Sequence, residues 1–204
     1  ENNLFELVYQ PQVDNITGEI HSCEALLRWS DAEKGNISPA IFIPIAEKSN
    51  LIMAIDEWVM EHVCRQCFKW HAMGLKGLRV DINLSGRQFN DKELIPKIHK
   101  YLNDYQLQPA DIGLELTEGV LIEGNKSGIA TVDELRRLGF EIALDDFGTG
   151  YSSLSYLKRF SISSLKIDRS FIVDAAINSE GVVLVNAIIA MAEALGLSVV
   201  AEGV

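Results

Sequence analysis

Acidic and amide side chains end five apolar stretches of this chain. Each stretch has the length and composition of a buried strand and carries Asp, Glu or Asn close to its end. Charged groups at the ends of buried strands are costly unless they are paired or bind a metal. The repetition therefore indicates one site assembled from several strands. The stretches are residues 22–29, 80–85, 112–118, 142–147 and 199–202, and they carry Glu24, Asn83, Glu115 with Glu118, Asp145 with Asp146, and Glu202.

The candidate ligands favour a hard divalent cation. They are all oxygen donors, on Glu24, Asn83, Glu115, Asp145 and Asp146. Mg²⁺ or Mn²⁺ prefers such ligands, whereas zinc prefers nitrogen and sulfur. Two ions about 4 Å apart suit phosphodiester hydrolysis, because one acidifies a water and the other stabilises the leaving oxygen. Asp145 and Asp146 cannot both face one side of a regular strand, but at its end each can face a different ion. A helix N-cap beside a solvated neighbour is the alternative for this pair.

A basic side chain accompanies the first carboxylate. Side chains alternate along a strand, so Glu24, Leu26 and Arg28 share one face. If Glu24 faces the site, the Arg28 guanidinium faces it too and is suited to bind a phosphate. A simple ion pair between these two side chains is the alternative.

Lys166 lies inside the apolar stretch 164–168 and is the second basic candidate. A lysine there can orient or deprotonate a metal-bound water, or neutralise charge in the transition state. An ion pair with Asp145 or Glu202 is the alternative, and the two roles are compatible. Glu202 closes the last stretch and could itself bridge a metal or help to deprotonate water.

The composition fits one domain and argues against a basic nucleic-acid surface. The chain has 204 residues, of which 48% are hydrophobic, and this is enough for one sizeable core. Its net charge is −11, so we expect no nonspecific binding to DNA or RNA, although a small anion can bind through cations. No apolar run reaches the ~18 residues of a membrane span and no signal peptide is recognisable. We therefore expect a cytoplasmic domain, either free or part of a membrane-anchored protein.

The three cysteines indicate a reducing compartment rather than a disulfide framework. Cys64 and Cys67 have CxxC spacing, but they fall in a helical pattern with no second pair. We therefore interpret them as buried thiols rather than zinc ligands. The four histidines show no ligand spacing.

Strand-like and helix-like segments alternate along the chain. This alternation predicts an α/β fold with a parallel sheet and outer helices. Polar groups at the ends of five strands favour a β/α barrel over a doubly wound sheet, whose site lies at one switch point. Residues 148–153 match a phosphate-binding glycine motif only weakly, and we interpret them as a mobile loop beside the carboxylates. The predicted strands are 5–13, 19–29, 78–85, 112–117, 141–146, 164–168 and 198–202, and the predicted helices are 39–48, 51–73, 91–105, 126–138, 152–159 and 180–195.

Eight motifs in order resemble the EAL domain family, which is named for the tripeptide found here at residues 24–26. The resemblance covers essentially the whole chain and implies a modified TIM (β/α)8 barrel with an antiparallel first strand. Family members continue with a helix, an eighth strand and a last helix, so we expect residues 1–204 to be an EAL domain truncated at its C-terminal end. The motifs are residues 9–11, 24–29, 42–47, 83–85, 115–118, 145–154, 166–168 and 201–204.

The resemblance also implies an activity, which is hydrolysis of cyclic di-GMP to the linear dinucleotide pGpG with Mg²⁺ or Mn²⁺. Two ions are expected, and the implied metal ligands are Glu24, Asn83, Glu115, Asp145 and, for the second ion, Asp146. Lys166 and Glu202 match the residues assigned to the catalytic water. Glu118 matches a glutamate that holds the loop after the fifth predicted strand, residues 141–146. Gln10, Leu26 and Arg28 match positions that contact the substrate.

The main alternative is a receptor module that binds cyclic di-GMP without cleaving it, within a larger signalling protein. A scaffold with a vestigial site is a third hypothesis. The retained set of metal ligands favours the enzyme over both. The resemblance also implies a homodimer, since family members often regulate the loop at residues 146–151 through a dimer contact, and it implies upstream sensory or cyclase domains.

Overall fold

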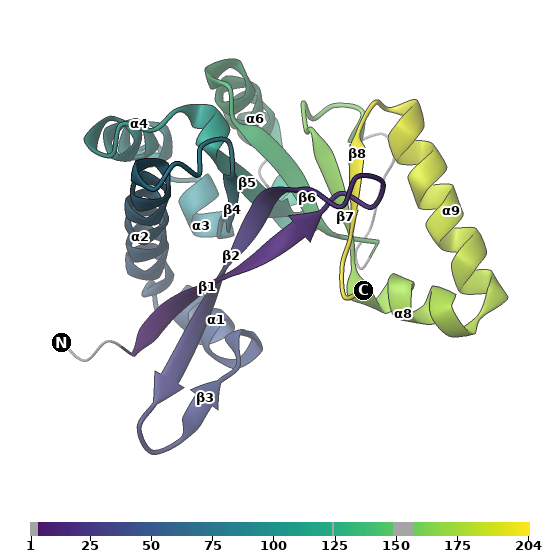
Figure 1. The fold of residues 1–204 in the computed structure, drawn as a ribbon, viewed down its shortest axis with the longest axis horizontal. Coiled ribbons are helices and arrows are strands. Elements are labelled where there is room, and N and C mark those ends of the chain that lie inside the picture. Colours follow the sequence, from purple (N-terminus) through teal and green to yellow (C-terminus); the bar gives the residue numbers. More distant parts are fainter. Residues whose placement is uncertain (1–3, 124, 149–156) are drawn as a thin grey trace. The chain divides into compact units, whose positions relative to one another are not determined.

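The computed structural model describes residues 4–123, 125–148 and 157–204. It divides into two compact units, Glu1–Gly113 and Leu114–Val204. Each unit combines strands with helices, in an order that can be followed along the chain in Figure 1. The α/β class predicted from the alternating pattern is therefore confirmed.

The first unit is organised around a long antiparallel hairpin. β1 (Phe5–Val13) pairs with β2 (Ile20–Asp31), and the Asp14 carboxylate accepts hydrogen bonds from backbone N–H groups in the turn between them. β2 also pairs with the short antiparallel strand β3 (Gly35–Ile37) and with the parallel strand β4 (Arg79–Asn83). The first strand is thus antiparallel to its neighbour, as predicted.

Alternation along β2 and β4 separates an apolar face from a polar one. Cys23 and Ala25 on β2 lie opposite Val80 and Ile82 on β4, and all four side chains are buried. This burial holds the two strands in one register, because a shift by one residue would turn every apolar side chain onto the polar face. The residues on the other face are polar, namely Ser22, Glu24, Arg79, Asp81 and Asn83.

Helices pack beside the sheet of the first unit, and α2 and α4 lie alongside one another (Figure 1). α2 buries an apolar stripe that includes Val59 and Val63. It also buries Cys64 and Cys67, and burial raises the pKa of the Cys64 thiol to about 12. The cysteines are therefore reduced core residues, as predicted. The helix bounds are α1 (Pro39–Lys48), α2 (Ile52–Ala72), α3 (Gly86–Phe89), α4 (Leu94–Asp104) and the 3-10 turn η1 (Pro109–Asp111).

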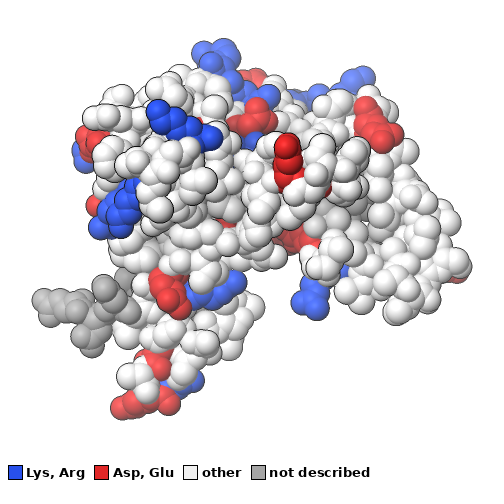
Figure 2. All heavy atoms as spheres, viewed as in Figure 1, with Lys and Arg blue, Asp and Glu red and all other residues white. Residues whose placement is uncertain are grey.

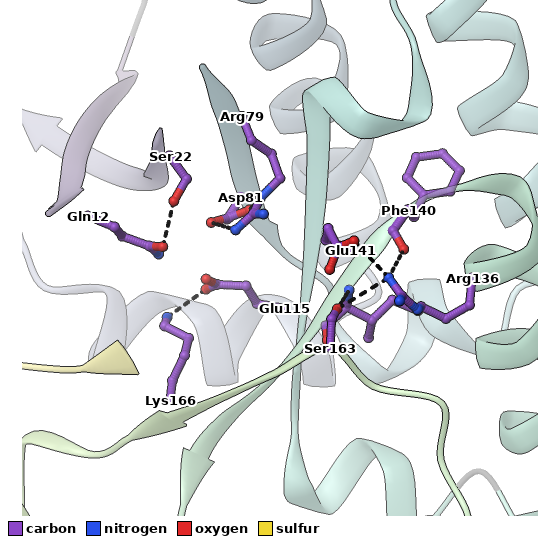
Figure 3. Close-up of polar contacts among 11 residues, drawn as sticks. Gln12, Ser22, Arg79, Asp81, Glu115, Arg136, Phe140, Glu141, Ser163 and Lys166 are labelled. Atoms are coloured by element: carbon purple, nitrogen blue, oxygen red, sulfur yellow. Dashed lines mark hydrogen bonds and ion pairs between the residues drawn. The ribbon is translucent and has the colours of Figure 1, made fainter. Parts of the chain in front are cut away.

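The second unit contains most of β5, followed by β6, β7 and β8. β7 runs parallel to both β6 and β8. The start of β6 is fixed by hydrogen bonds: the backbone N–H of Ile142 donates to Ser163 Oγ at 2.7 Å, and Arg136 Nη1 donates to the Phe140 carbonyl at 2.8 Å (Figure 3). The bounds are β5 (Ile112–Thr117), β6 (Glu141–Phe147), β7 (Ser164–Ile167), β8 (Ser198–Ala201), α5 (Glu118–Glu123), α6 (Asn125–Leu138), α8 (Arg169–Ile177) and α9 (Ser179–Ala194).

The structure adds elements that the sequence pattern did not predict, namely β3, α3, α5 and α8. The first two are only three and four residues long, too short to show a periodicity. The helix predicted at 152–159 falls mostly on residues outside the described ranges. Within those ranges no helix is both long and apolar enough to cross a membrane. Acidic and basic side chains are interspersed on the face drawn in Figure 2.

Candidate active site

Two predicted metal ligands meet in the first unit. Glu24 lies on β2 and Asn83 ends the adjacent parallel strand β4. Asn83 Nδ2 donates a hydrogen bond to Glu24 Oε1 at 2.8 Å. The amide nitrogen is thereby directed at the glutamate, which leaves the Asn83 carbonyl oxygen as the donor suited to a cation.

The predicted substrate-contacting residues share the face of Glu24. The β1–β2 register places Gln10 directly opposite Glu24, Val8 opposite Leu26 and Glu6 opposite Arg28. Arg28 Nη1 donates to the neighbouring Leu27 carbonyl at 3.0 Å. The common face predicted for Glu24, Leu26 and Arg28 is therefore observed, and the hairpin adds Gln10 to it.

A buried aspartate on α2 supports the turn that follows Asn83. Ser85 Oγ donates to Asp56 Oδ2 at 2.5 Å and accepts from the Gln88 backbone N–H at 3.1 Å, so it caps α3. Burial, with a smaller effect from the charge of Glu47, raises the pKa of Asp56 to about 6 despite the Ser85 hydrogen bond. Asp56 is not predicted from the sequence pattern, because one acid within a long amphipathic helix looks like a surface residue.

Lys166 is the centre of a buried ionic cluster in the second unit. Its side chain on β7 is 2% exposed. Its Nζ lies 2.7 Å from Glu115 Oε2 on β5, 3.2 Å from Asp145 Oδ1 on β6 and 2.8 Å from Glu202 Oε1 after β8. Figure 3 shows the Lys166 and Glu115 side chains pointing toward each other. The ion pairs of Lys166 with Asp145 and Glu202, which the sequence offered as an alternative, are thus present, and Glu115 is a further partner.

The adjacent aspartates lie at an irregularity of β6. Leu144 pairs with Leu165, but the next pairing joins Phe147 to Ile167, so β6 carries an extra residue between these positions. Asp146 has a φ of 54°, which is the left-handed region. A bulge of this kind re-aims a side chain. It explains how neighbouring residues can both serve one site, which a regular strand would not allow.

Three carboxylates of the second unit lie close enough to share a cation. Asp145, Asp146 and Glu202 each offer an oxygen, and these oxygens lie within 4.8 Å of one another. With Glu115 they carry four negative charges, against the one positive charge of Lys166. Because a buried excess of negative charge is costly, this oxygen-only cluster fits one or more hard divalent cations.

Glu118 begins α5, directly after β5. Its side chain is buried, and its Oε2 makes no hydrogen bond to any part of the chain that the structure describes. The loop that Glu118 is expected to hold includes residues 149–156, which lie outside the described ranges. Its role therefore stays a prediction.

Comparison with known proteins places these residues in a family. The family model described as "EAL domain" matches residues 1–204. The chain belongs to the EAL domain family. The cyclic di-GMP phosphodiesterase PdeR of Escherichia coli K12 is 42% identical over 204 residues, which are all of this chain and 31% of that protein. The bifunctional diguanylate cyclase and cyclic di-GMP phosphodiesterase MucR of Pseudomonas aeruginosa is 41% identical over 204 residues, again all of this chain and 30% of that protein.

Solved structures of EAL proteins have the same fold. The structure of the MucR phosphodiesterase in complex with c-di-GMP superposes with a TM-score of 0.94 at 41% identity, covering 98% of this chain and 81% of that one. The EAL enzyme Bd1971 with cAMP and cyclic di-GMP bound gives a TM-score of 0.94 at 34% identity, covering all of this chain and 56% of that one. The predicted fold class, a modified TIM barrel with an antiparallel first strand, is confirmed by these matches. The EAL domain spans about a quarter to a third of the length of the curated relatives it matches.

Proposed function

We propose that this EAL domain is a metal-dependent phosphodiesterase that hydrolyses cyclic di-GMP to linear pGpG. The observation that carries the proposal is the Lys166 cluster, in which one buried ammonium contacts a carboxylate on β5, a carboxylate on β6 and the carboxylate that follows β8. Such a concentration of buried charge is typical of a catalytic centre. PdeR and MucR, whose names state this activity, support the same substrate.

The proposed cation ligands are the five oxygen-donor residues that the resemblance implies. They are Glu24, Asn83, Glu115, Asp145 and Asp146. We propose two ions, as the family resemblance implies. We propose Mg²⁺ or Mn²⁺ as their identity, because every ligand is a hard oxygen donor. When bound, such ions polarise the phosphodiester and lower the pKa of a coordinated water.

The remaining roles follow from the position of each side chain. Lys166 holds Glu115, Asp145 and Glu202 in fixed positions and can donate to an anionic oxygen. Glu202 is the least buried of these three carboxylates, and this suits a group that takes a proton from water. Gln10, Leu26 and Arg28 contact the substrate, and the Arg28 guanidinium is the group suited to a phosphate.

We further propose that the domain works as a homodimer within a larger signalling protein, with sensory or cyclase domains upstream. The relatives that the chain matches are three to four times longer than it, which supports the larger protein, and the dimer rests on the family resemblance. Sedimentation at several concentrations tests the dimer: a monomer at every concentration would contradict it.

The deciding experiment incubates the protein with cyclic di-GMP and Mg²⁺ or Mn²⁺ and follows pGpG by chromatography. We expect turnover in the natural protein and in Glu33→Ala, which changes an exposed glutamate after β2. Glu24→Ala should abolish the turnover of cyclic di-GMP. Tight binding of cyclic di-GMP without pGpG would instead identify a receptor and refute the proposal.

A further inference from the structure

The first turn of α8 is fixed directly behind the Lys166 strand. Asp168 follows β7 and caps the helix, since its carboxylate accepts from the Ser170 backbone N–H at 3.0 Å and from the Ser170 hydroxyl. The cap determines where the next side chains, Arg169 and Phe171, point. Neither residue is one of the proposed metal ligands.

Phe171 lies against the backbone that carries the adjacent aspartates. Gly148 follows them by two residues and has a φ of 98°. A Cβ added at Gly148 would lie 2.7 Å from both Cε2 and Cζ of Phe171, closer than real Cβ contacts. The ring therefore fills the space beside this glycine. It restricts the path of the backbone just after Asp146, whose own φ of 54° is unusual for a non-glycine residue.

Arg169 makes the equivalent contact at the end of β8. Gly203 directly follows Glu202 and has a φ of 73°. A Cβ there would lie 2.3 Å from Arg169 Cγ and 2.7 Å from Cδ. The contact is made by the aliphatic stem of Arg169, so it depends on packing and not on the guanidinium charge.

We propose that Arg169 and Phe171 are positioning residues, which set the Asp146 and Glu202 carboxylates for cation binding. The two contacts come from one helical turn and fix two different strand ends, each beside a carboxylate of the same three-residue cluster. Substitution of residues that orient metal ligands typically lowers metal affinity by about 10- to 100-fold. The proposal rests on the proposed metal-dependent function, but its test reads cation binding rather than turnover.

The test is a titration of the full protein with Mn²⁺, followed by the electron paramagnetic resonance signal of free Mn²⁺. We expect Phe171→Ala and Arg169→Ala each to weaken Mn²⁺ binding by about tenfold. Arg169→Met keeps the aliphatic stem and should bind Mn²⁺ like the natural protein. Val173→Ala alters an exposed apolar side chain of the same helix and should also leave binding unchanged.

Urea unfolding of each variant without divalent ions separates positioning from general stability. A merely structural role would lower the free energy of unfolding while leaving the Mn²⁺ affinity of the folded protein unchanged, and that result would overturn the proposal. Equal loss of Mn²⁺ affinity in Val173→Ala would also overturn it. If Phe171→Ala does not fold, Phe171→Leu serves instead: it should still bind Mn²⁺ more weakly, and unchanged affinity would refute the role of the ring.

The same titration keeps this proposal separate from the proposed function. Natural protein that binds Mn²⁺ but releases no pGpG would contradict the phosphodiesterase and leave the positioning result standing. Natural protein that binds no Mn²⁺ would refute both.

Discussion

Replacing Lys166 with methionine removes the positive centre of the carboxylate cluster. Methionine has a similar length and no charge, so the substitution changes electrostatics more than packing. It leaves Glu115, Asp145 and Glu202 without the ammonium that lies 2.7, 3.2 and 2.8 Å from them. Glu115 is the most deeply buried, with 1% of its side chain exposed, and so suffers the largest loss.

The expected cost of Lys166→Met is about 3–5 kcal/mol of unfolding free energy, because removing one partner of a buried ion pair leaves an uncompensated charge. For a domain of this size each kcal/mol shifts the melting temperature by about 2–4 °C. Divalent cations should recover part of the loss, since they supply positive charge to the same carboxylates.

Lys97→Met is the matched control. Lys97 also contacts two carboxylates, Glu57 at 2.5 Å and Asp91 at 3.3 Å, but 39% of its side chain is exposed. Pairs exposed to water contribute only about 0–1 kcal/mol. Both variants are unfolded with urea at pH 7 without divalent ions. A loss at Lys166 no larger than the loss at Lys97 would refute the electrostatic account of the cluster.

Three further predictions concern other parts of the site. Burial raises the pKa of Asp56 to about 6, above its usual value of 3.8, so folding takes up a proton between these pH values and the free energy of unfolding falls as the pH rises through them. The unfolding free energy of Asp56→Asn, relative to that of the natural protein, should therefore rise by about 2 kcal/mol between pH 4 and pH 8, and a pH-independent difference in urea unfolding would contradict this. Asp146→Gly should raise metal-free stability by about 1 kcal/mol, because it relieves a left-handed backbone and like-charge repulsion, while weakening Mn²⁺ binding; a loss of stability in urea would argue against strain at Asp146. Removal of divalent ions with EDTA should abolish pGpG formation and lower the melting temperature, and activity that survives dialysis against EDTA would refute metal dependence.

The sequence was sufficient to predict every described strand except β3. Polar residues at strand ends are a local signal, so Glu24, Asn83 and Asp145 could be selected from pattern alone. Alternation along β2 correctly placed Leu26 and Arg28 on the face of Glu24, because a period of two needs no tertiary information.

Other features depend on contacts between distant segments and could not be read from the pattern. The bulge that re-aims Asp146 arises from the pairing of β6 with β7. Asp56 gains its role only from Ser85, which is 29 residues away. α8 was missed because its cap, Asp168, continues an apolar stretch and reads as the end of a strand.

The most direct test of the central claim is hydrolysis of cyclic di-GMP in water enriched in ¹⁸O, with Mg²⁺ or Mn²⁺ present and pGpG analysed by mass spectrometry. If a water attacks the phosphodiester, the terminal phosphate of pGpG gains one ¹⁸O atom, and Glu24→Ala yields no labelled product. Bound cyclic di-GMP recovered intact, or pGpG formed without the label, would contradict the account.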